Sequence, residues 1–99
     1  ALTVLLAAGL DGIENGMDCG KPVNKNIFRM SKREKRRRKI YQLPTSLFEA
    51  LNFLEKDTVI SDALGEHIYD HFLFNKRKEW EEYIRVIHHW EITRYLDRY

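Results

Sequence analysis

Hydrophobic residues recur at helical spacing along most of this chain, and the clearest run lies between Glu66 and Ile87. Apolar or long side chains fall there at three- and four-residue steps, which is typical of one face of an amphipathic helix. These positions are Tyr69, Leu73, Lys76, Trp80, Tyr83, Ile84 and Ile87, with Ile68 and Phe72 beside them. The charged residues within 76–82 predict that a charged face of the same helix points toward water. They are Lys76, Arg77, Lys78, Glu79, Glu81 and Glu82. We therefore expect one long helix from Glu66 to about Ile87.

Capping signals predict where two shorter helices begin. Ser31 with Glu34 and Ser46 with Glu49 each form the S-x-x-E pattern, in which the serine oxygen accepts a hydrogen bond from a backbone N–H of the first turn. Pro44 disfavours helix before the second of these boxes. The first box predicts a short basic helix to about Lys39, and the second predicts a helix with apolar residues at helical spacing.

Stop signals complete the pattern. The pair Asn15-Gly16 can end a helix over residues 1–14, because glycine readily takes the left-handed conformation of a helix end. Gly65 closes a further short helix over 57–64. We find no convincing strand alternation and no internal repeat, so the sequence predicts a mostly α fold.

The first ten residues are strongly apolar, but this run stops at Asp11. It is about half of the ~20 residues that a membrane-spanning helix needs, and no basic segment precedes it. The pattern predicts a buried core helix, and we expect no membrane partner. Because the helix is apolar from its first position, we also expect the chain to be a piece of a longer one.

Charge is concentrated in residues 29–41, which hold eight basic residues and one acid, a net +7, while the rest of the chain has nine basic and 14 acidic residues, a net −5. Such a run suggests contact with phosphate or nucleic acid. No aromatic residue interrupts the basic run to stack on bases, so a solvated helix face is favoured. An independent basic module that binds nucleic acid or an acidic protein remains the alternative function.

Candidate catalytic or metal-binding residues are few. His67 and His71 lie four apart on one helix face, which could present two imidazoles to zinc, but no third ligand and no HExxH order accompany them. Cys19 is a single cysteine, so it forms no internal disulfide. We find no glycine-rich phosphate loop and no dense carboxylate cluster, and Asp11 with Glu14 is more simply a helix end than a catalytic pair. We therefore expect no catalytic, cofactor or metal site.

Four sequence strings carry a family resemblance. They are LAAGLDGI at 6–13, NKNI at 24–27, LPTSLFEAL at 43–51 and ALGEHIYDH at 63–71. In this order and at these separations they resemble the last quarter of a type I glutamine synthetase of the Gram-positive and archaeal branch. The resemblance covers nearly the whole chain. It implies that residues 1–99 are the helical C-terminal part of an α+β catalytic domain that is incomplete here.

The resemblance also implies a function for the whole enzyme. Members of this family are cytoplasmic ligases that join ammonia to glutamate with ATP and Mg or Mn ions. They assemble as two stacked rings of six subunits and meet nitrogen-regulatory proteins. The family's nucleotide, metal and glutamate ligands lie upstream of this segment, so the resemblance implies that the chain alone is structural and inactive.

Position 28 bears on regulation, and the C-terminal tail bears on assembly. In the adenylylated branch of the family, a tyrosine after the Lys-Asn-(Leu/Ile) stretch accepts AMP, and here that position is Phe28, which has no hydroxyl. The resemblance further implies that the C-terminal tail enters the facing ring. Its apolar residues are Trp90, Tyr95, Leu96 and Tyr99. The alternative is a tail folded back on Trp80 and Tyr83.

Overall fold

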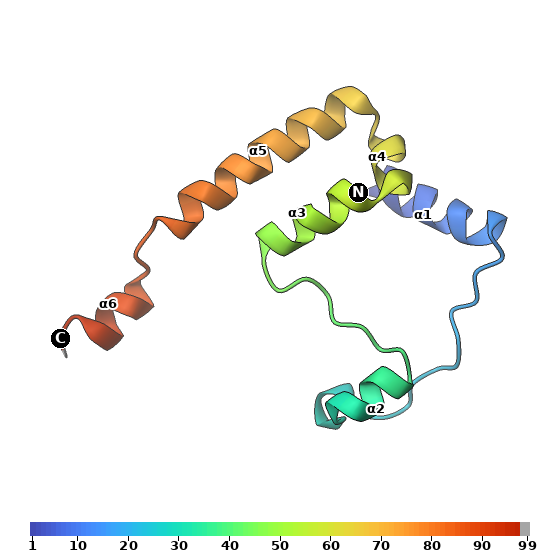
Figure 1. The fold of residues 1–99 in the computed structure, drawn as a ribbon, viewed down its shortest axis with the longest axis horizontal. Helices are drawn as coiled ribbons and strands as arrows, with labels where there is room; N and C mark the ends of the chain where they lie inside the picture. The colour runs from blue at the N-terminus through green and yellow to red at the C-terminus, as the bar shows by residue number, and fades with distance from the viewer. Residues whose placement is uncertain (98–99) are drawn as a thin grey trace.

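The computed structural model describes residues 1–97, and all regular structure in that range is helical (Figure 1). In chain order the elements are α1 (Leu2–Glu14), the 3₁₀ turn η1 (Ile27–Arg29), α2 (Lys32–Arg37), α3 (Leu47–Lys56), α4 (Thr58–Leu64), α5 (Glu66–Ile84) and α6 (His89–Tyr95). The predicted mostly α fold is confirmed. No helix in residues 1–97 combines the length and the hydropathy needed to cross a membrane.

Both predicted capping boxes form at the serine. Ser31 Oγ accepts from the backbone N–H of Glu34, and Ser46 Oγ accepts from the backbone N–H of Glu49, each at 3.2 Å. The reciprocal bond in the second box differs from the usual pattern, because the Glu49 carboxylate accepts from Thr45, one residue before the cap. These contacts fix the first turns of α2 and α3.

Three residues with positive φ mark helix ends. Gly16 (φ 59°) ends α1 as predicted, with the Met17 N–H donating to the Gly12 carbonyl at 2.9 Å. Gly65 (φ 80°, ψ 157°) separates α4 from α5, also as predicted. Lys39 (φ 57°) ends α2 in the same left-handed conformation without being a glycine. No sequence signal predicted the left-handed conformation of Lys39.

The small core lies where α3 and α5 meet. Leu51 of α3 is 2% exposed, and Tyr69, Leu73 and Trp80 of α5 are half-buried beside α3. α4 packs against both helices. The predicted stripe runs to Ile87, but α5 ends at Ile84 and this end of the helix is exposed. A helix of ten residues spans about 15 Å, so α3 covers only part of the 19-residue α5.

α1 packs against α4 on one side only. The sequence predicted a buried core helix here, and within residues 1–97 the helix has no buried residue. Its large apolar side chains are exposed, and they are Leu2, Leu5, Leu6, Leu10 and Ile13. A large apolar surface of this kind is usually covered by other protein, and within residues 1–97 no element covers it.

The chain is open rather than compact. Its radius of gyration is 18.8 Å, whereas a compact domain of this length has about 13 Å. Two parts extend from the packed helices in Figure 1: α2 at the end of two extended connections, and α6 beyond the far end of α5.

Candidate functional site: an apolar assembly surface

The C-terminal tail presents an apolar surface. Trp90 is 62% exposed and Leu96 is 71% exposed, although both belong to or follow the short helix α6. The Trp90 and Tyr95 rings meet edge to face with centroids 6.0 Å apart, and the Arg94 guanidinium lies 5.4 Å from the Trp90 centroid. A shallow hollow of about 890 Å³ lies on this tail; its lining residues are Ile87, Trp90, Glu91, Ile92, Tyr95 and Leu96.

The tail does not lie back along the long helix. Figure 1 shows α6 beyond the end of α5, pointing away from the packed helices. Trp80 instead stacks on Phe48 of α3, with centroids 6.1 Å apart, and on Tyr83 at 5.9 Å. The fold-back alternative is therefore not the arrangement in the structure. Of the predicted assembly residues, Tyr99 lies outside the described residues.

Arg77 bridges α5 and α3, although the sequence pattern predicted that this side chain faces water. Arg77 Nη2 donates to Glu55 Oε1 at 2.6 Å and to Asn52 Oδ1 at 2.9 Å. Its guanidinium also lies 5.5 Å from the centroid of the Phe48 ring. Arg77 therefore joins the two helices by charge, hydrogen bond and cation–π contact, and the expectation that it faces water was wrong.

Phe28 lies in η1, far from the tail. Its side chain is 98% exposed, and its backbone N–H donates to Asn26 Oδ1 at 3.0 Å. That bond fixes the backbone of the turn but leaves the ring in solvent. The two predicted regulatory and assembly positions are thus not brought together, because one lies beside α2 and the other on α6.

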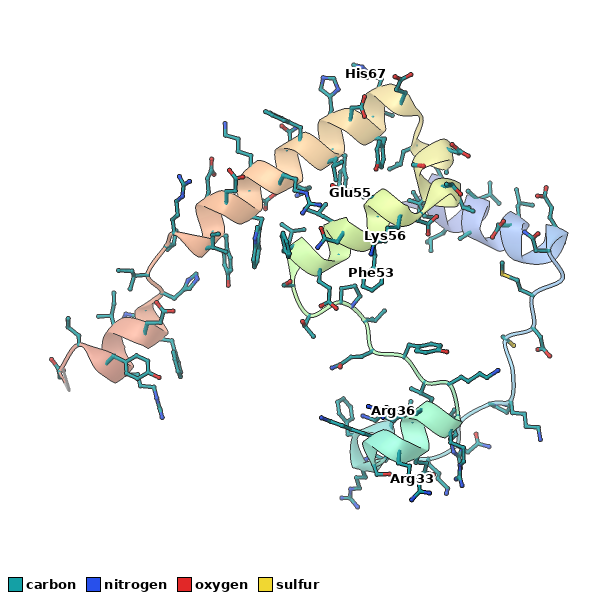
Figure 2. The ribbon with its side chains drawn as sticks, viewed as in Figure 1. Arg33, Arg36, Phe53, Glu55, Lys56 and His67 are labelled. Atoms are coloured by element: carbon teal, nitrogen blue, oxygen red, sulfur yellow. The ribbon has the colours of Figure 1, made fainter. Side chains whose placement is uncertain are left out.

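The two histidines of α5 meet each other. Their ring centroids are 4.3 Å apart, and His71 Nδ1 lies 2.8 Å from the His67 carbonyl oxygen (Figure 2 labels His67). Within residues 1–97, no three His, Cys, Asp or Glu side chains gather as a metal site. Asp11 accepts a hydrogen bond from Asn15 Nδ2 at 2.8 Å, which supports its interpretation as part of a helix end.

The carboxylate of Glu49 has a shifted pKa. The backbone N–H of Thr45 donates to Glu49 Oε2 at 2.9 Å, and the Thr45 hydroxyl donates to the same oxygen at 3.0 Å. Both bonds favour the charged form, the backbone one more, so they lower the pKa of Glu49 below its ordinary value. Thr45 and Ser46 also line a hollow against Trp80 and Tyr83. Glu49 therefore fixes the backbone at Thr45, just before the N-terminus of α3.

Comparison with known proteins gives one family. Residues 1–95 match the family described as glutamine synthetase, catalytic domain. The glutamine synthetase of Thermus thermophilus is 50% identical over 99 residues, which are all of this chain and 22% of that protein. The glutamine synthetases of Methanosarcina mazei and Thermotoga maritima are each 45% identical over 96 residues, 97% of this chain and 22% of theirs.

The chain belongs to the glutamine synthetase family, so the family that the four sequence strings resemble is confirmed, and the branch within it stays a prediction. It spans 22% of the length of these relatives.

Proposed function

We propose that this chain is the helical C-terminal part of a glutamine synthetase and that its role there is structural and in assembly. The whole enzyme joins ammonia to glutamate with ATP, using Mg or Mn ions. The observation that carries this proposal is the imbalance between core and surface: within residues 1–97 only Leu51 and Met30 are buried apolar side chains, while large hydrophobic residues stand exposed on α1, α3, α5 and α6.

Exposed apolar area of this extent is rare on a protein that works alone, and it marks surfaces that other protein covers. We assign the exposed face of α1 to the remainder of the catalytic domain, because α1 already packs on α4 by its other side. We assign the tail of α6 to a neighbouring subunit, since it extends away from its own helices. Aromatic residues such as Trp90 bury about 150 to 250 Å² each when they find a pocket.

The partners in this proposal are other subunits of the same enzyme, in two stacked rings of six, with nitrogen-regulatory proteins as further contacts. The compartment is the cytoplasm. Catalysis, nucleotide binding and metal binding belong to parts of the enzyme outside these 99 residues, so the chain alone needs no cofactor.

The test is ATP-dependent formation of glutamyl hydroxamate from glutamate and hydroxylamine. The whole protein that carries this chain should form the product, and the purified 99-residue chain should give no more than a buffer control. Product formed by the chain alone would show that it holds an active site. No product from the whole protein would remove the proposed ligase activity.

A further inference from the structure

The strongest charge on the molecule lies on residues 27–41, here named the basic lobe. The lobe consists of η1, α2 and the turn that follows, and it carries a net +7. Its one acid, Glu34, already pairs with Lys25 Nζ at 3.5 Å and with Arg38 Nε at 3.4 Å. Within residues 1–97 the other cations of the lobe have no ion-pair partner; they are Arg29, Lys32, Arg33, Lys35, Arg36, Arg37 and Lys39.

The lobe has a defined frame. Met30, 9% exposed, is the buried side chain of the lobe, and Ser31 caps the start of α2. At the other end, the Ile40 N–H donates to the Lys35 carbonyl at 2.9 Å and the Lys39 N–H donates to the Arg36 carbonyl at 3.1 Å. These two bonds close α2 in a Schellman motif. The free charges are therefore held on ordered backbone rather than on a loose tail.

Figure 1 shows the lobe apart from the packed helices, and Figure 2 shows Arg33 and Arg36 on α2 away from α3 and α5. Arg33 and Arg37, one helical turn apart, line an open hollow of about 520 Å³ together with Ser31 and Glu34. Guanidinium groups bind phosphate with two parallel hydrogen bonds, and the ion pairs of Glu34 offset its repulsion of an anion.

Two exposed aromatic residues lie at the two ends of the lobe along the chain. Phe28, in η1 before α2, is 98% exposed, and Tyr41, just after α2, is 86% exposed. Phe28 lies just before the basic run of residues 29–41 and Tyr41 is its last residue, so neither ring interrupts the charges themselves. Exposed rings on a basic surface are the platforms on which the bases of single strands stack, whereas a carboxylate-rich peptide gains little from them.

We infer that the basic lobe binds single-stranded nucleic acid, with phosphates on its free arginines and bases stacked on Phe28 and Tyr41. The sequence alone favoured a solvated helix face over nucleic-acid binding, and this inference favours nucleic-acid binding instead. RNA and DNA strands share the chemistry on which the inference rests. It does not depend on the proposed ligase activity, because the lobe is separate from the assembly surface.

The experiment measures fluorescence anisotropy of labelled 20-nucleotide U-rich RNA and T-rich DNA strands with the whole protein that carries this chain. We expect binding at micromolar protein in 50 mM salt. If about five phosphates are neutralised, the log–log salt slope should be about −3.5, so affinity should fall about 100-fold by 200 mM. No binding at micromolar protein, or binding insensitive to salt, would overturn the inference.

Charge variants separate the lobe from general electrostatics. The double variant Arg33→Glu and Arg36→Glu should make the salt slope shallower by about 1.4, because two phosphate contacts are lost. The control Lys56→Glu and Lys78→Glu changes net charge equally on α3 and α5, outside the lobe, and should leave the slope unchanged. Equal weakening by both pairs would contradict a site on the lobe.

Ring variants test stacking. Phe28→Leu should weaken strand binding by about tenfold, and Phe28→Tyr, which keeps the ring, should not. Circular dichroism checks that each variant keeps its helix content. A polyglutamate peptide of equal length should bind more weakly than either strand; tighter binding of that peptide, with no effect of Phe28→Leu, would assign the lobe to an acidic protein and overturn the inference.

Discussion

At the scale of single residues, the hydrogen bonds of Glu49 make the stability of the fold depend on pH. Its pKa is lowered by the Thr45 backbone N–H and then by the Thr45 hydroxyl. A lowered pKa means that the charged carboxylate stabilises the fold at neutral pH. That contribution is complete above the pKa of an unfolded glutamate and is lost as the pH falls through the lower folded value.

Thr45→Val should therefore raise the pKa of Glu49 part of the way to its ordinary value, because the hydroxyl donor is lost and the stronger backbone donor remains. Titration of the Glu49 carboxyl carbon by NMR measures this directly. A carboxyl that titrates identically in both proteins would show that the Thr45 hydroxyl has no part in the shift.

Phe28 gives a second prediction at this scale. Because a benzene ring has no oxygen nucleophile, the whole protein should take no AMP at position 28 when it is incubated with ATP and an adenylyltransferase. Phe28→Tyr should supply the acceptor, since the ring at this position is exposed and accessible. Mass spectrometry of the peptide that contains residue 28 tests both. AMP on the unmutated peptide would show that another residue accepts it.

At the scale of elements, Gly65 sets the turn from α4 into α5. Its φ of 80° and ψ of 157° lie in a region that is essentially restricted to glycine, although a Cβ there would meet no atom within 4 Å. Gly65→Ala should therefore cost about 1 to 3 kcal/mol of folding free energy from backbone strain alone.

The matched control is Gly9→Ala in the middle of α1, where a Cβ also meets nothing within 4 Å. Here the backbone is helical, so alanine should stabilise by about 0.5 to 1 kcal/mol. Chemical unfolding of the chain followed by circular dichroism compares the two. Equal effects of both substitutions would show that the conformation of Gly65 is not the cause.

The sequence predicted these elements well where the signal is local. Ser31 and Ser46 mark the starts of α2 and α3, and Gly16 and Gly65 mark helix boundaries, because each acts on backbone groups within a few residues. Arg77 was misplaced for the opposite reason: its partner Glu55 is 22 residues away, and only the packing of α5 on α3 brings them together. Lys39 was missed because left-handed ends are usually glycine.

At the scale of the whole molecule, the same limit applies to the candidate site. The sequence predicted an aromatic tail, and the structure adds that α6 stands clear of α5 with Trp90 and Leu96 exposed. Local patterns cannot predict what covers this surface. They also cannot predict the open shape, with a radius of gyration of 18.8 Å, because that depends on how helices far apart in the sequence pack.

The central claim is that this chain assembles an enzyme rather than catalysing a reaction, and the tail tests it most directly. The measurement is the mass, by light scattering at sub-micromolar concentration, of the whole protein ended after Ile87, compared with the intact protein. Without Trp90, Tyr95 and Leu96 the proposed contact between rings should be lost, so the mass should fall to that of single rings or smaller species. A truncated protein that keeps the full double-ring mass would contradict the account.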